Sequence, residues 1–181
     1  MITIKKRLSE AITRAKPIIE ERMNVKLGKI KVEPLSEYYT LLSSERVPYL
    51  SFLEFSFALT AKAADTRVFY SRNPALHLAL PSNKHMLWLA AHELGHIAHS
   101  RLIGKSIEDP EGIAKLPEFM SEGFAEYIAR EVVISLGSSG CKPWSPIYGN
   151  HSSYLRQLEE VLRLNGVRNL EEAIQYMRTS I

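Results

Sequence analysis

His92, Glu93 and His96 form the pattern His-Glu-x-x-His inside the segment LAAHELGHIAHS, residues 89–100. On a helix, positions four apart share one face with β-carbons about 5–6 Å apart, so the two imidazoles can bind one ion. Zinc takes histidine nitrogens at about 2.0–2.1 Å. Glu93 projects about 100° further round the axis, where a general base acts on a zinc-activated water. The pattern predicts a catalytic zinc site with two histidine ligands and Glu93 as the base.

Such a site needs a third protein ligand and an open position. Cys141 is the only cysteine, which excludes a cysteine-rich site and any intrachain disulfide. His99 lies near the same face, but Leu102 occupies the position of a third histidine in the longer motif of this kind. We therefore expect His99 on the helix surface or beside the ligands. Carboxylates remain as candidates: Glu108, Asp109 and Glu111 in a loop, and Glu118, Glu122 and Glu126 four apart on the next helix.

The segment HELGH, followed after 25 residues by the Glu122 of LPEFMSEGFAEYIA, resembles the gluzincin zinc metallopeptidases. The resemblance is strongest to the peptidase-MA-like and aminopeptidase-N superfamily group and covers about residues 85–130. It implies that Glu122 is the third zinc ligand and that Glu126 orients a zinc histidine. It also implies one zinc ion per chain and a peptide or protein substrate.

Further chemistry follows from the same resemblance. Related enzymes stabilise the developing oxyanion with a downstream tyrosine or histidine, and PIYGNHSSY offers Tyr148, His151 and Tyr154. They also pair an extended substrate with an edge strand, a role open to TRVFY (66–70) or ALHLALP (75–81).

Other interpretations of these residues stay open. HELGH with His99 is also similar to the IrrE/ImmA regulators, which are proteases that act on repressors. Glu122 and Glu126 could instead form a solvated helix face paired with Arg130. The whole chain could be a non-catalytic zinc-binding regulatory or interaction module, or a latent protease whose own termini fill the cleft.

The elements that would position these residues follow from hydrophobic periodicity and end signals. Pro17 predicts a kink or break in the first helix, Ser82 or Asn83 a helix start, and Pro34 a strand end. The turn SRNP separates the strands TRVFY and ALHLALP. The expected helices are 3–23, 46–63, 83–102, 117–136, 150–164 and 169–178.

Strands before the motif and helices after it predict an α+β, zincin-like fold. A small sheet would lie next to the active-site helix, followed by a glutamate helix and C-terminal helices. The length of 181 residues predicts a single domain, 1–181, with its metal-binding core at about 66–136. The net charge of +3 comes from 23 basic and 20 acidic residues with no long basic tract, so we expect no nucleic-acid partner. Without a signal peptide or an apolar span, we expect a cytoplasmic protein that contacts no membrane.

Overall fold

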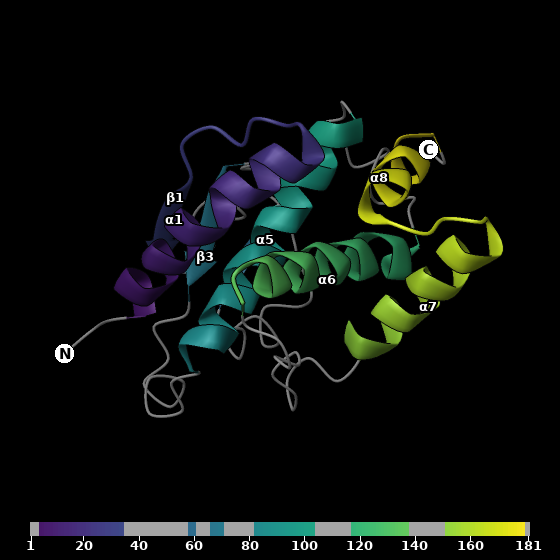
Figure 1. Ribbon diagram of the computed structural model, residues 1–181. Helices are drawn as coiled ribbons and strands as arrows, with labels where there is room; N and C mark the ends of the chain where they lie inside the picture. Colours follow the sequence, from purple (N-terminus) through teal and green to yellow (C-terminus); the bar gives the residue numbers. More distant parts are fainter. Residues whose placement is uncertain are drawn as a thin grey trace, which may run out of the picture.

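The computed structural model describes residues 4–34, 58–60, 66–70, 82–103, 117–137 and 151–179. These residues form an α+β arrangement in which a small sheet lies at one side of the helices (Figure 1). The helices are α1 (Ile4–Met23), α5 (Asn83–Ile103), α6 (Glu118–Ser135), α7 (His151–Leu164) and α8 (Leu170–Thr179). The strands are β1 (Lys31–Pro34), β2 (Ala58–Thr60) and β3 (Arg67–Tyr70).

Helix α5 is the central element of the fold. From Met86 to Ser100 every residue except His96 is buried. Helices α1 and α6 pack against it from different sides, and β2 also contacts it (Figure 1). A helix that is apolar around its whole circumference is stable only in an interior. The segment that carries the histidines is therefore held by neighbours on nearly every face.

The ends of several helices agree with the sequence signals. The hydroxyl of Ser82 accepts the backbone N–H of His85 at 3.3 Å, which caps the start of α5. Helix α6 ends before Gly137 and α7 before Gly166, two glycines with φ of 70° and 75°. The residue after a helix end often adopts the left-handed backbone conformation, which glycine takes without strain.

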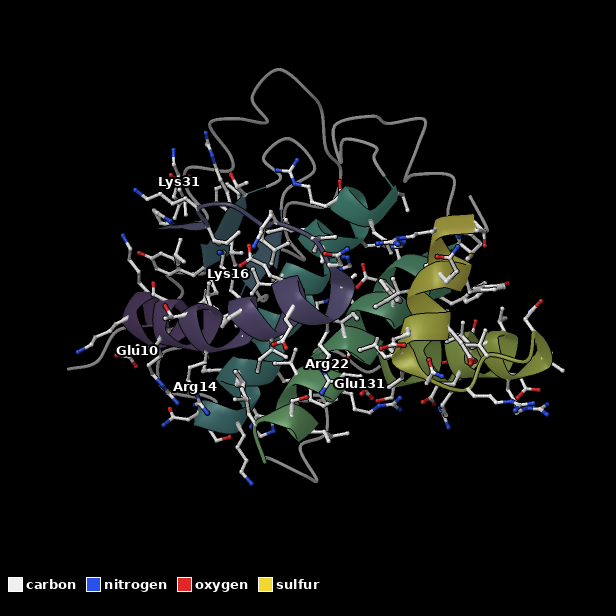
Figure 2. The ribbon with its side chains drawn as sticks, turned by 45° about the horizontal axis from the view of Figure 1, so that its top comes forward. Glu10, Arg14, Lys16, Arg22, Lys31 and Glu131 are labelled. Carbon is white, nitrogen blue, oxygen red and sulfur yellow. The ribbon has the colours of Figure 1, made fainter. Side chains whose placement is uncertain are left out.

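Helix α1 supplies one wall of the core. Pro17 lies inside the helix and does not end it, so the predicted break is absent. The outward face of α1 carries charged side chains, among them Glu10, Arg14 and Lys16 (Figure 2). At its C-terminal end, Arg22 donates a hydrogen bond to the Ser135 hydroxyl of α6 at 3.2 Å. The inward face consists of Ile4, Leu8, Ala11, Ile12, Ala15, Ile19 and Met23.

The sheet has the strand order β1-β3-β2, with β1 parallel and β2 antiparallel to β3. Two sequence expectations are wrong here. The predicted helix 46–63 contains the strand Ala58–Thr60, because pairing with β3 and not local periodicity decides its conformation. The segment TRVFY is the central strand, so both its edges are already paired and it cannot take a substrate strand. The second candidate, ALHLALP, lies outside the described residues.

None of the described helices is both long enough and apolar enough to serve as a membrane span.

Candidate metal centre

His92, His96 and Glu122 meet where α6 crosses α5. The Nε2 atoms of the two histidines are 3.1 Å apart. The Glu122 Oε2 lies 3.3 Å from the His92 Nε2 and 3.4 Å from the His96 Nε2. The two imidazole rings are nearly perpendicular, at 87°, with centroids 4.8 Å apart. Three potential ligand atoms from two helices thus form a nearly equilateral triangle.

The size of this triangle fits a tetrahedral metal ion. Ligand atoms at 2.0–2.1 Å from one zinc ion, at tetrahedral angles, lie about 3.3–3.4 Å from one another. The three observed separations, 3.1, 3.3 and 3.4 Å, are close to that value. Two imidazole nitrogens that face each other at such a distance also need a proton or a cation between them, since both cannot direct lone pairs at the same space. The donor set therefore fits a divalent metal ion.

Glu126 supports the first histidine from the opposite side of its ring. Its Oε1 lies 3.1 Å from the His92 Nδ1, and its Oε2 accepts the indole N–H of Trp88 at 2.7 Å. Glu126 is only 2% exposed and His92 only 4%. A metal-binding histidine commonly donates its other ring N–H to a carboxylate, which fixes the ring's tautomer and orientation. Glu126 is placed to do this for His92.

The charges around the site favour a protonated His92 when no metal competes. Burial alone would lower the pKa of His92, but hydrogen bonds to Glu122 and Glu126 raise it well above its ordinary value. Burial would likewise raise the pKa of Glu122, but His96 and His92 beside it hold it far below its usual range. Glu122 is thus a carboxylate in the folded protein, the form in which it can bind a metal ion.

Two glycines let the three helices of the site approach one another. A Cβ on Gly95 of α5 would lie 3.0 Å from the Cα of Ala125 in α6. A Cβ on Gly123 of α6 would lie 2.7 Å from the carbonyl oxygen of Tyr154 in α7. The close approach of Ala125 accounts for a glycine at position 95 inside the helix, where glycine costs about 1 kcal/mol relative to alanine. Because Gly123 follows Glu122 directly, its contact with α7 also helps to fix the main chain at this candidate ligand.

The candidate oxyanion donors are only partly described. Tyr148 lies outside the described residues, and His151 is the first residue of α7, with a side chain that is not described. Tyr154 is half-buried on α7, and its main chain packs against Gly123 beside the ligand Glu122. Helix α7 therefore adjoins the candidate metal centre, while the donor role stays a prediction for all three residues.

His99 is not the surface residue that one alternative expected. It is 2% exposed and its ring packs on Phe124 with centroids 4.9 Å apart. Burial lowers the pKa of His99 to about 4, with a further contribution from the charge of His96. Its Nε2 has no hydrogen-bond partner within the described part of the chain. His99 is a neutral core residue one turn beyond the ligands.

The interpretation of Glu126 as part of a solvated, arginine-paired helix face is wrong. Arg130 instead contacts Glu159 of α7 and Glu131 of its own helix, and it lies over the Tyr127 ring. Glu126 points inward to Trp88 and His92.

Trp88 is the contributor that sequence reasoning missed. Its one available signal was its position one turn before His92 on α5, since its partner Glu126 lies 38 residues away.

Among the described residues, the one group of histidine, cysteine or acidic side chains that could hold a metal ion is His92, His96 and Glu122. Comparisons with protein-family models, curated proteins and solved structures found no match for this chain.

Proposed function

We propose that this chain is a zinc-dependent peptidase of the gluzincin type, with a zincin-like arrangement of α5 and α6 around one zinc ion. The observation that carries the proposal is the triangle of His92 Nε2, His96 Nε2 and Glu122 Oε2, with sides of 3.1–3.4 Å. Glu93, the neighbour of the first ligand, supplies the remaining element of a hydrolytic site. Its substrate would be a peptide or protein.

The choice of zinc rests on the ligands and on what stands beside them. Two histidines and one carboxylate also suit iron(II) in some oxygenases. Here, however, the histidines are four apart on one helix, and a glutamate directly follows the first of them. That spacing aims a carboxylate at the space beside the ion, which is the arrangement of zinc hydrolases. Elemental analysis of the purified protein distinguishes the two metals.

Each residue then has a defined task in peptide hydrolysis. Zinc bound by the three ligands would polarise the scissile carbonyl and lower the pKa of a water molecule. Glu93 accepts the proton of the attacking water and returns it to the leaving amine, a general acid–base role. Glu126 keeps His92 oriented by accepting its Nδ1 proton. The burial of Glu93, 4% exposed, excludes most solvent from the proton that it carries.

The same geometry favours catalysis over a structural zinc site, which is usually closed by four protein ligands. Glu126 is not available as a fourth ligand, because its two oxygens face His92 and Trp88. The side chains of His96 and Glu122 are 19% and 32% exposed. Solvent therefore reaches the side of the triangle formed by these two ligands, where a substrate carbonyl could approach.

The substitution Glu93→Gln tests the proposal. Glutamine preserves the shape of Glu93 but cannot accept a proton at neutral pH, so peptide cleavage should fall by about 10²–10⁴-fold while zinc content is unchanged. Glu10→Gln on the exposed face of α1 is the matched control and should cleave like the wild type. Equal cleavage by wild type and Glu93→Gln would show that Glu93 is not the base.

A non-catalytic zinc module predicts retained zinc and no cleavage by any of the three proteins. The assay uses the whole chain, because the inward faces of α1 and α8 belong to the core. Trimming either terminal helix to relieve a latent state would remove core residues such as Leu8 and Met177. A broad peptide mixture read by mass spectrometry covers the unknown sequence preference.

A further inference from the structure

Trp88, Glu126 and His92 form one line of close polar contacts that ends at the candidate metal position. The Trp88 Nε1 donates to the Glu126 Oε2 at 2.7 Å, and the Glu126 Oε1 lies 3.1 Å from the His92 Nδ1. Trp88 and His92 are one turn apart on α5, so a single carboxylate from α6 spans both. All three side chains are buried, with exposed fractions of 6%, 2% and 4%.

The chemistry of the indole sets the direction of this chain. An indole N–H can only donate, whereas a hydroxyl in its place could also accept. The Glu126 Oε2 must therefore act as an acceptor. When the carboxyl group is ionised, its Oε1 can only accept as well, so it would take the Nδ1 proton of His92. With its proton on Nδ1, the neutral ring of His92 would present the lone pair of Nε2 to an ion placed between it, Glu122 and His96. The Trp88 bond thus favours the tautomer that a metal ligand needs.

The burial of the carboxylate makes the Trp88 bond consequential. A buried oxygen without a donor loses its hydration and gains nothing in return. If the indole N–H were removed, the Glu126 carboxylate would gain by rotating toward another donor or toward water. Such a rotation would take the Oε1 away from the His92 ring. Hydrogen bonds to a charged acceptor are stronger than those between neutral groups. Removing the Trp88 N–H would therefore cost the Glu126 carboxylate a strong hydrogen bond.

We propose that Trp88 is a positioning residue of the metal centre: through Glu126 it holds His92 in the Nδ1-protonated tautomer and thereby raises metal affinity without contacting the ion. This inference rests on the proposed zinc site and names a residue that sets its affinity. It does not depend on which substrate the site hydrolyses, or on cleavage at all.

The test is Trp88→Phe, which removes the N–H and keeps a buried aromatic ring. The zinc dissociation constant is measured by competition with a chromophoric chelator, and it should rise roughly tenfold, within the range known for groups behind metal ligands. The same substitution in a Glu126→Ala background should have little further effect, because its route to His92 is already cut. Equal losses in both backgrounds, or no loss in the wild-type background, would overturn the proposal.

Two further measurements distinguish a positioning role of Trp88 from a purely structural one. Ile128→Val on α6, two residues from Glu126, is a buried control that should lower the melting temperature and leave the zinc dissociation constant unchanged. Long-range ¹H–¹⁵N spectra of the histidine rings report the tautomer of His92 directly. In the metal-free protein, at a pH high enough to deprotonate the His92 ring, they should show the proton on Nδ1 in wild type and a mixture of the two tautomers in Trp88→Phe. An unchanged spectrum in the variant contradicts the inference.

The two proposals fail in distinguishable ways. If the wild type binds no zinc, the proposed metal site itself is wrong. If the wild type binds zinc and Trp88→Phe binds it equally well, only the role of Trp88 is wrong. The binding assays need no active peptidase, so a wild type that binds zinc and cleaves no peptide still tests Trp88.

Discussion

Gly95 of α5 lies against the main chain of Ala125 in α6, so closely that a Cβ at position 95 would come within 3.0 Å of the Ala125 Cα and 3.3 Å of its carbonyl oxygen. The contact lies between His92 and His96 on one helix and between Glu122 and Glu126 on the other. It sets the separation of the two helices that provide the ligands. The glycine inside the motif therefore sets the spacing of the helices that carry the proposed zinc ligands.

Gly95→Ala should destabilise the protein, although alanine is the better helix former by about 1 kcal/mol. The added methyl group meets backbone atoms that cannot rotate away, and overpacking of this kind costs typically 1–3 kcal/mol. Because α6 must move outward, zinc affinity should fall together with the melting temperature. Thermal unfolding and chelator competition measure the two effects. A rise in melting temperature would show that the two helices do not pack as described.

Glu122→Ala should remove the third ligand and leave no zinc bound after dialysis. Glu118→Ala, one turn earlier on α6, should keep about one zinc per chain. Both proteins are compared by elemental analysis after the same dialysis, with circular dichroism as a check that each is folded. If Glu118→Ala lost the metal and Glu122→Ala kept it, the triangle of ligand atoms would not be the binding site.

Glu126→Ala should weaken zinc binding by about 10–100-fold without abolishing it. It should also lower the melting temperature of the metal-free protein, because it leaves the buried N–H of Trp88 without its acceptor. An unsatisfied buried donor costs about 1–3 kcal/mol. A variant with unchanged zinc affinity would show that Glu126 does not orient His92.

The stability of the metal-free protein should depend on pH through His92 and Glu122. The folded-state pKa of His92 is raised, so its contribution is complete below the unfolded value of about 6.5 and is lost as pH rises through the folded value. The pKa of Glu122 is lowered, so its contribution is present above about 4.3 and is lost only in strong acid. The charged pair of His92 and Glu122 therefore stabilises the metal-free chain most between about pH 4.3 and about pH 6.5, the two unfolded-state pKa values.

Zinc should change how stability depends on pH above about pH 5.5. It binds the neutral imidazole and competes with the proton, so it binds more tightly as the pH rises. The difference in melting temperature between zinc-loaded and chelator-treated protein should grow from pH 5.5 to pH 8. Thermal scans of both forms across this range measure it, and Glu122→Ala should show almost no difference at any pH. A gap that shrinks toward pH 8 would contradict the assignment of His92 as a ligand.

Local signals in the sequence account for much of what the structure describes. The i, i+4 spacing of His92 and His96 predicts their shared face, since it depends on helix geometry alone. The start of α5 follows from the side chain of Ser82, and the end of α7 follows from the backbone freedom of Gly166. Both residues act within one helical turn.

Long-range pairing explains what sequence reasoning missed. The strand Ala58–Thr60 forms because it pairs with β3, and no local pattern reveals that partner. The central position of β3 likewise depends on two distant segments. Trp88 lies in an apolar run, and in the sequence nothing distinguishes it from any other core aromatic residue. Its role depends on a hydrogen bond to Glu126, which lies 38 residues later. Glu122 could be named only through a family resemblance, since three evenly spaced glutamates on α6 are equivalent by spacing.

The burial of α5 on nearly every side also bears on the order in which the protein is made. Ribosomes release a chain from its N-terminus, so α1 is available to cover α5 before α6 has emerged. His92 and His96 then exist as a bare pair, while Glu122 follows His96 by 26 positions (96 to 122). Until that stretch has left the ribosome, the nascent chain offers an ion only two of its three ligands. The proposed zinc ion could therefore be bound by all three ligands only late in biosynthesis, after α6 has emerged.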